Sequence, residues 1–395
     1  MQGAPVRVVG ALGTAQTLAW ASSYYLPAML ADPMARDLGV SAPTVYAAFS
    51  AAMVASALAG PWVGLAIDRH GGRIVLVSTS LLFAFGLGML GAAQGFRVMV
   101  AAWLVIGVAM GAGLYEAAFS SLVRLYGHGA RGAITGITLI AGFASTVGWP
   151  LSAWLEAQFG WRGACFGWAA MHLLIGLPLN AWLPKASAVA KAENLSATDA
   201  KQIDASRVSE SGQQRYATVL LAFVFAATWF ISTAMATHLP RMLEAAGTTL
   251  SAAVAVGALI GPAQVAGRLL EFGLLRQVHP LLSARLAALA HPAGVAALLI
   301  AGPTMAALFA ILHGAGNGIL TIAKGTLPLA LFGPLGYGTR QGWLMMPARV
   351  AQALAPFLFG LALNRWGANA LWLSGGLSLA ACAALLVLRA RPSAD

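Results

Sequence analysis

Long apolar segments alternate with short polar ones along the whole chain. The apolar segments are continuous rather than alternating residue by residue, which favours helices over the strands of a barrel. Each is long enough for the roughly 20 apolar residues that one helical crossing of a bilayer requires. The predicted membrane helices cover residues 8–31, 43–67, 74–95, 98–122, 132–157, 162–183, 216–240, 250–272, 282–301, 303–325, 341–363 and 368–388.

One polar segment, from Pro184 to Arg215, separates the first six predicted helices from the last six. It mixes charged residues with alanine and serine, so it cannot cross a membrane and is predicted to be a linker, with room for a surface helix. The predicted organisation is an N-terminal six-helix bundle over residues 1–183, a linker over 184–215 and a C-terminal six-helix bundle over 216–395.

The two halves share small motifs at nearly constant spacing. Gly60-Pro61 matches Gly261-Pro262, and Gly111-Ala112-Gly113 matches Gly314-Ala315-Gly316, at offsets of about 201 and 203 residues. Together the matches indicate a duplicated, pseudo-symmetric bundle. Transporters built from repeated halves place their substrate site near the membrane midplane, between the halves. The predicted fold class is therefore an all-α membrane protein with twelve transmembrane helices in two pseudo-symmetric six-helix bundles.

Composition excludes several classes of protein. Of 395 residues, 59% are hydrophobic and 9% are charged, against about 25% charged in soluble domains. A soluble enzyme, a disordered protein and a nucleic-acid binder are therefore not expected. The two cysteines, Cys165 and Cys382, lie in apolar runs and suggest neither a disulfide nor a metal site. The sequence has no phosphate-binding loop and no nucleophile–base motif, so neither an enzyme nor a cofactor is predicted.

The net charge of +11 is read as an orientation signal, because lysine and arginine collect in cytoplasmic loops. Most basic residues fall in one set of loops, together with the linker and both chain ends. The opposite set holds only Arg36, Arg97, Arg162, Arg241 and Arg365. We expect a multi-pass protein of a bacterial inner (plasma) membrane, with cytoplasmic termini, in contact with lipid and present as a monomer.

The most specific motif is the segment Gly64-Leu-Ala-Ile-Asp68-Arg69-His70-Gly71-Gly72-Arg73. It resembles the signature loop of the major facilitator superfamily, although Gly72 stands where a basic residue is more usual. The resemblance implies a conformational role for Gly64, Asp68, Arg69, Gly71 and Arg73: the loop docks on the opposite half and locks one transport state. The second half lacks an Asp-containing repeat of this motif, and Glu271 is expected to be a poor substitute.

Further segments resemble the monocarboxylate and oxalate–formate branch of that superfamily. They are a basic stretch over residues 127–136, the turn Gly160-Trp161-Arg162, and the pair Gly267-Arg268. The resemblance implies that Arg268 holds a substrate carboxylate. The run Gly148-Trp149-Pro150 differs from the glycine-rich motif of drug/proton antiporters, which lowers the weight of that alternative.

Ionisable residues deep in a membrane are costly and mark candidate functional sites. His313 lies about ten residues into its helix, roughly 15 Å deep, and Arg349 has a similar depth. The candidate substrate-binding residues are Tyr24, Trp229, Arg268, His313, Asn317 and Arg349. The candidate proton-coupling residues are Glu116 and His313.

Structural alternatives stay open for each of these residues. Arg349 or Arg268 can instead pair with Glu116 to hold the helices together, and His313 can be a packing residue. Lys324 is expected to reach the cytoplasmic interface along its aliphatic stem.

The sequence thus predicts a secondary active transporter that works by alternating access and moves a small organic anion, such as a monocarboxylate, with protons as a possible coupling ion. The alternative is an efflux transporter for apolar or cationic compounds, favoured by the abundance of Trp, Phe and Met. A membrane-embedded enzyme, a receptor and a channel are weaker alternatives.

Overall fold

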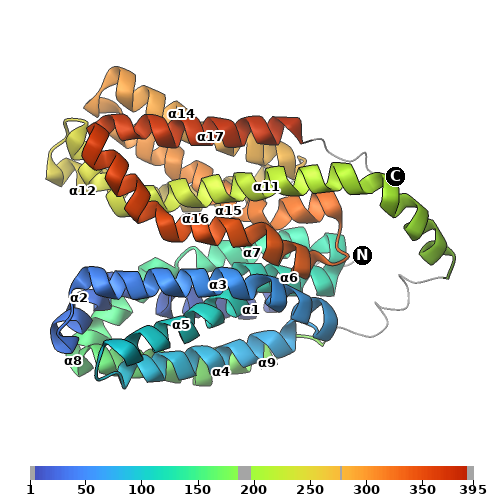
Figure 1. Cartoon of the computed structure of the whole chain (residues 1–395), viewed down its shortest axis with the longest axis horizontal. Helices are drawn as coiled ribbons and strands as arrows, with labels where there is room; N and C mark the ends of the chain where they lie inside the picture. The colour runs from blue at the N-terminus through green and yellow to red at the C-terminus, as the bar shows by residue number, and fades with distance from the viewer. Residues whose placement is uncertain (1–4, 186–196, 276–277, 389–395) are drawn as a thin grey trace.

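The computed structural model describes residues 5–185, 197–275 and 278–388, and nearly all of them are helical (Figure 1). The first half contains α1 (Val6–Ser22), α2 (Pro27–Leu38), α3 (Ala42–His70), α4 (Gly72–Gly91), α5 (Phe96–Gly113), α6 (Tyr115–Tyr126), η1 (Gly127–Ala130), α7 (Arg131–Ala141), α8 (Ala144–Met171), the π-helix η2 (His172–Gly176) and α9 (Leu177–Ala181). The second half contains α11 (Ala197–Ala245), α12 (Leu250–Gly257), α13 (Ile260–Gly273), α14 (Pro280–Ala301), η4 (Pro303–Met305), α15 (Ala306–Phe332), α16 (Tyr337–Trp366), η5 (Gly367–Asn369) and α17 (Ala370–Val387).

The prediction of an all-α membrane fold with two six-helix bundles is confirmed, since each predicted crossing is occupied by one or more of these helices. Seven stretches of the described residues are apolar and long enough to span a bilayer, judged by length and composition. Two of them, Phe96–Ala181 and Tyr337–Val387, contain several helices each.

Several predicted crossings are broken into two helices near mid-depth. The crossing predicted over 98–122 divides at Leu114, whose backbone is extended (φ −84°, ψ −167°). Carbonyl groups freed inside a membrane must find another donor, and here side chains of the same bundle supply it. Gln16 donates to the carbonyl of Gly113 at 2.6 Å, and Thr79 donates to that of Ala112 at 3.0 Å. The break is thereby stabilised, and α6 starts anew beside the centre of the molecule.

The two halves lie against each other, and α1 begins at the same end of the molecule at which α17 ends (Figure 1). We call this the terminal end. The ribbons of α3 and α16 converge toward the terminal end and diverge toward the opposite end (Figure 1). Helix α11 starts at Ala197, inside the segment predicted as a linker, while residues 186–196 lie outside the described residues. The exact domain boundaries remain a prediction.

Glycines allow α3 and α16 to meet backbone to backbone. Gly60 and Gly64 of α3 lie against Gly342 and Gly338 of α16. A Cβ atom added to Gly342 would lie 2.5 Å from the carbonyl oxygen of Gly60, closer than real Cβ atoms approach an oxygen. Small residues at such positions let membrane helices pack closely. This contact joins the halves along the terminal side of the molecule.

Gly342→Val should force α3 and α16 apart. Overpacking a tight contact costs about 1–3 kcal/mol, so we expect a lower unfolding temperature in detergent and loss of the close contact between the halves. Gly376→Val is the matched control, because a Cβ atom at Gly376 of α17 meets no atom within 4 Å. Equal unfolding temperatures for the two variants would contradict the close contact.

Candidate functional site

Four charged side chains gather where the two halves meet. Glu116 comes from the first turn of α6, and Arg268, Lys324 and Arg349 come from α13, α15 and α16. All three basic residues are buried, with exposed fractions of 6%, 4% and 3%. One carboxylate of the first half therefore faces three cations of the second half.

Arg349 and Glu116 form an ion pair that joins the halves. Nη2 of Arg349 lies 2.8 Å from Oε2 of Glu116, and Nη1 donates to Gln352 at 3.2 Å. The carboxylate also sits in the first turn of α6, where the helix dipole favours negative charge. Of the pairings that the sequence left open for Glu116, the structure therefore shows the one with Arg349.

Lys324 points inward, and the expectation that it reaches the interface is wrong. Its Nζ lies 3.8 Å from the centre of the Trp229 ring. The charged groups close enough to act on it electrostatically are Glu116, Arg349 and Arg268. Counting residues along a helix gives depth, but it does not show which way a side chain points, so the sequence did not reveal this position.

Arg268 also reaches across the boundary between the halves. Its Nη1 donates to the carbonyl of Thr138 in α7 at 3.1 Å, and its buried Nε has no hydrogen-bond partner. Its charge acts on Tyr25 and Tyr115 of the first half. The arginine suggested by the branch resemblance thus lies in the same region as Lys324.

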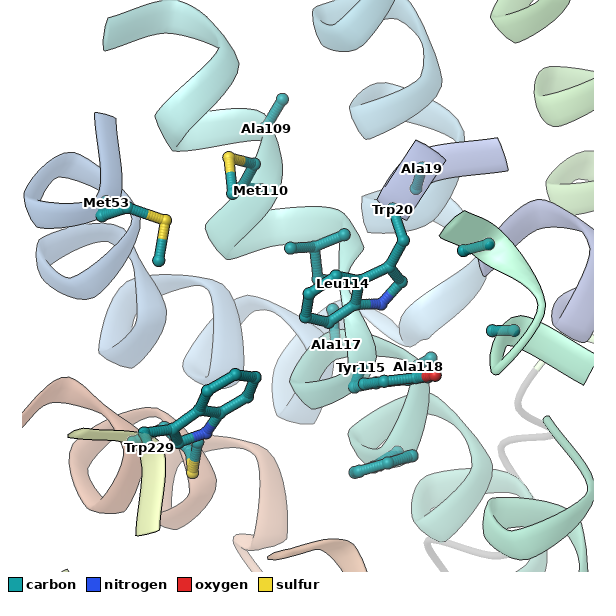
Figure 2. Close-up of a cluster of buried hydrophobic side chains, with 14 of the residues drawn as sticks. Ala19, Trp20, Met53, Ala109, Met110, Leu114, Tyr115, Ala117, Ala118 and Trp229 are labelled. Atoms are coloured by element: carbon teal, nitrogen blue, oxygen red, sulfur yellow. The ribbon is translucent and has the colours of Figure 1, made fainter. Parts of the chain in front are cut away.

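Aromatic rings surround the charged cluster. Trp20 of the first half and Trp229 of the second are nearly parallel, with an interplanar angle of 11° and ring centres 6.3 Å apart. Tyr115 lies 4.9 Å from Trp20, and Figure 2 shows these three rings together. The predicted residue Tyr24 packs edge-on against Trp20 at 5.3 Å. Cζ of Arg349 is 5.9 Å from the Trp20 ring and 5.3 Å from the Trp229 ring.

His313 lies elsewhere. Its Nδ1 is 3.0 Å from Nδ1 of His291, and His291 in turn meets the Ser374 hydroxyl at 3.1 Å. These contacts are inside the second bundle, among α14, α15 and α17. The structure therefore does not bring His313 into the charged cluster, and its contacts are those of the packing residue that the sequence left open.

Asn317 is one turn nearer the cluster than His313. It donates to the Ser232 hydroxyl of α11 at 3.0 Å, three residues from Trp229. Among the residues that the structure describes, no group of three or more His, Cys, Asp or Glu side chains could hold a metal.

The signature loop contacts the opposite half at the terminal end. Oδ1 of Asp68 accepts from the backbone N–H of Gly338 at 3.0 Å. Oδ2 accepts from the Thr339 N–H at 2.7 Å and from its hydroxyl at 2.9 Å. Gly71 has a φ of 89°, a conformation that glycine adopts readily, and it makes the turn between α3 and α4. Asp68 thus caps the start of α16.

A second carboxylate, that of Glu271 in α13, also binds a residue of the opposite half. Glu271 follows Asp68 by 203 residues, as Gly267 follows Gly64. Its Oε1 lies 3.1 Å from Nη2 of Arg131, the first residue of α7. Arg131 also donates to the carbonyls of Leu275 and Val278, at 3.3 and 2.9 Å. Glu271 therefore contacts the opposite half as Asp68 does, but its buried Oε2 has no hydrogen-bond partner. The expectation that it is a poor substitute stays a prediction.

Comparisons with known proteins agree with this architecture. The sequence profile of the Major Facilitator Superfamily matches residues 12–294. Three solved structures are similar in fold. The proton:xylose symporter XylE has a TM-score of 0.74 and 14% identity, and the match covers 96% of this chain and 94% of XylE. The E. coli fucose:proton symporter FucP has a TM-score of 0.72 and 13% identity, with 96% of this chain and 97% of FucP covered. The human organic anion transporter MFSD10 has a TM-score of 0.67 and 18% identity, with 97% of this chain and 100% of MFSD10 covered. At these identities the likeness shows the fold alone.

Asp68→Ala should loosen the terminal end. The substitution removes three hydrogen bonds that Asp68 accepts from α16. Loss of about 2 kcal/mol of stabilisation, within the range for one hydrogen bond to a charged group, would shift the equilibrium between closed and open conformations of this end roughly thirtyfold. Spin labels on exposed His70 and Leu335, each changed to cysteine, should show a new population at longer distance.

Asp37→Ala is the control for this measurement, because Asp37 bonds to Trp161 and Arg162 within the first half. An unchanged label distance in Asp68→Ala would show that this carboxylate does not hold the terminal end closed.

Proposed function

The chain belongs to the major facilitator superfamily, and from that premise we propose that it is a secondary active transporter that moves a small organic anion by alternating access. The observation that carries this proposal is the surplus of buried positive charge between the halves. Arg268, Lys324 and Arg349 face a single carboxylate, Glu116. An anionic group in such a water-poor space interacts strongly with these cations.

Unpartnered hydrogen-bond donors near the cluster support the same conclusion. The buried donors without a partner include the indole N–H groups of Trp20 and Trp229, Nε of Arg268 and the side-chain amide Nε2 of Gln352. Buried donors are normally satisfied, so a ligand rich in acceptor atoms suits this place. A carboxylate is such a ligand, since it accepts through two oxygens.

The proposed binding residues contact different parts of the substrate. Arg268 and Arg349 bind the anionic group, and Tyr24, Trp229 and Asn317 line the remaining space and fix the apolar part of the substrate. A monocarboxylate fits this division, in keeping with the resemblance of Gly267-Arg268 to the monocarboxylate and oxalate–formate branch. His313 has no role in binding in this proposal.

Glu116 is the proposed proton-coupling residue. Its ion pair with Arg349 joins the halves, so the pair has to break when the halves separate at the terminal end. A proton on Glu116 removes the charge that holds Arg349. A small pocket lies beside the pair, and Ser56, Ser120, glycines of α3 and α16 and several apolar side chains line it together with Glu116 and Arg349.

The terminal end is proposed to face the cytoplasm of a bacterial inner membrane, because α1 begins and α17 ends there and the basic loops of the sequence are expected on the cytoplasmic side. In this proposal the contacts of Asp68 and Glu271 hold the cytoplasmic end closed, as expected for an outward-facing state. We propose a monomer as the transporting unit.

Efflux of apolar or cationic compounds is the second candidate. The ring cluster around Trp20 and Trp229 favours it, whereas three buried cations oppose the entry of a positively charged compound. Binding of tetraphenylphosphonium without binding of any carboxylate would support efflux over anion transport.

Arg268→Gln should weaken carboxylate binding at least tenfold, because a hydrogen bond to a charged group contributes about 1.5–3 kcal/mol. Binding of butyrate to the purified protein, followed by thermal shift, measures this change. Arg241→Gln is the matched control, since Arg241 bonds to Asn364 far from the cluster. Wild-type binding and uptake in Arg268→Gln would rule out this anion site.

Glu116→Gln should separate transport from proton coupling. The amide keeps its hydrogen-bonding shape but cannot release a proton, so exchange of labelled for unlabelled substrate should persist in proteoliposomes. Uphill accumulation driven by a pH gradient should be lost. Accumulation equal to wild type would exclude Glu116 as the coupling residue.

A further inference from the structure

We propose that Lys324 joins Arg268 and Arg349 as an anion-binding cation and that it sets the charge of the substrate, so that the preferred substrate is a dianion of the dicarboxylate class rather than a monocarboxylate. This inference rests on the proposed anion transport and refines it. It starts from a residue that the motif resemblances do not mark.

Lys324 has no carboxylate of its own. Glu116 is engaged by Arg349 at 2.8 Å, and within the part of the chain that the structure describes no side chain accepts a hydrogen bond from Nζ of Lys324. Its one close contact is the face of the Trp229 ring, 3.8 Å away. A cation–π contact offsets only part of the cost of burying an ammonium group. The ammonium group of Lys324 is therefore buried without a hydrogen-bonded counter-ion.

Arg268 is in the same condition. Its guanidinium donates a hydrogen bond to the neutral carbonyl of Thr138, and its buried Nε has no hydrogen-bond partner. Lys324 and Arg268 are close enough to act on each other electrostatically. Three basic side chains and one carboxylate give the cluster a formal net charge of +2. A monoanion would leave one charge uncompensated, while a dianion would neutralise both.

The lysine is also well fixed for such a role. Gln341 of α16 donates to the backbone carbonyl of Lys324 at 3.0 Å, and the Tyr337 hydroxyl donates to that of Gly325 at 2.7 Å. These bonds anchor this turn of α15 to α16. The ammonium group can therefore turn from the ring to a carboxylate without movement of its backbone.

The test compares acids that differ by one carboxylate at equal chain length: malonate with propionate, succinate with butyrate, and glutarate with valerate. Their binding to the full-length protein is measured by thermal shift. We expect wild type to bind the best diacid at least tenfold more tightly than its monoacid. Lys324→Gln should remove that preference, weakening the diacid at least tenfold and the monoacid less than threefold. Lys324→Arg should retain it.

A second measurement needs no ligand. Lys324→Met removes an uncompensated charge, so the unfolding temperature of the empty protein should rise. Arg349→Met leaves Glu116 unpaired, so that temperature should fall. A fall for Lys324→Met would show that the lysine has a structural partner and would overturn the proposal.

The outcomes separate this inference from the proposed function. If wild type binds monoacids as well as diacids and Lys324→Gln changes neither, the role of Lys324 is wrong while anion transport stands. If wild type binds no acid of either kind, anion transport itself is wrong and this inference falls with it.

Discussion

The free-energy cost of an unpaired charge inside a membrane governs how this molecule is arranged. At the terminal end, Asp68 and Glu271 each find donors on the opposite half. At the centre, Glu116 finds Arg349. Each of these pairs crosses the boundary between the halves, so satisfying the charges and assembling the two bundles are one process. The remaining cations, Arg268 and Lys324, are the exception, and the proposed function follows from that exception.

The contacts of Asp68 and Glu271 show how the two halves of a duplicated fold can use a carboxylate at equivalent positions with different hydrogen-bond donors. In one copy, a carboxylate accepts from backbone N–H groups at the start of α16. In the other copy, a carboxylate pairs with Arg131 at the start of α7. At Gly338 the close approach of Asp68 leaves no room for a Cβ atom, whereas an arginine side chain can reach a carboxylate from farther away. The copies can therefore diverge in sequence and still close the same end.

The fold was predictable from the sequence because apolar runs report directly on burial in a bilayer. Depth was predictable too, and the residues that it selects, Glu116, Arg268 and Arg349, are buried near one another at the boundary between the halves. The direction in which a side chain points was not predictable, because a residue count along a helix does not distinguish the boundary between the halves from the interior of one bundle. His313 and Lys324 therefore lie in places that the sequence does not indicate. The break at Leu114 was also missed, because it depends on Gln16 and Thr79, which are distant in sequence.

The pair formed by Trp20 and Trp229 has a consequence of another kind. Each half contributes one ring, and the two rings are nearly parallel at close range. Indoles at this separation influence each other's absorption and emission, and the effect falls steeply with distance. A motion of the bundles that changes the separation of Trp20 and Trp229 would therefore alter the light that these two rings absorb and emit. The fluorescence of Trp20 and Trp229 would thus report on the conformation of the transporter without an added label.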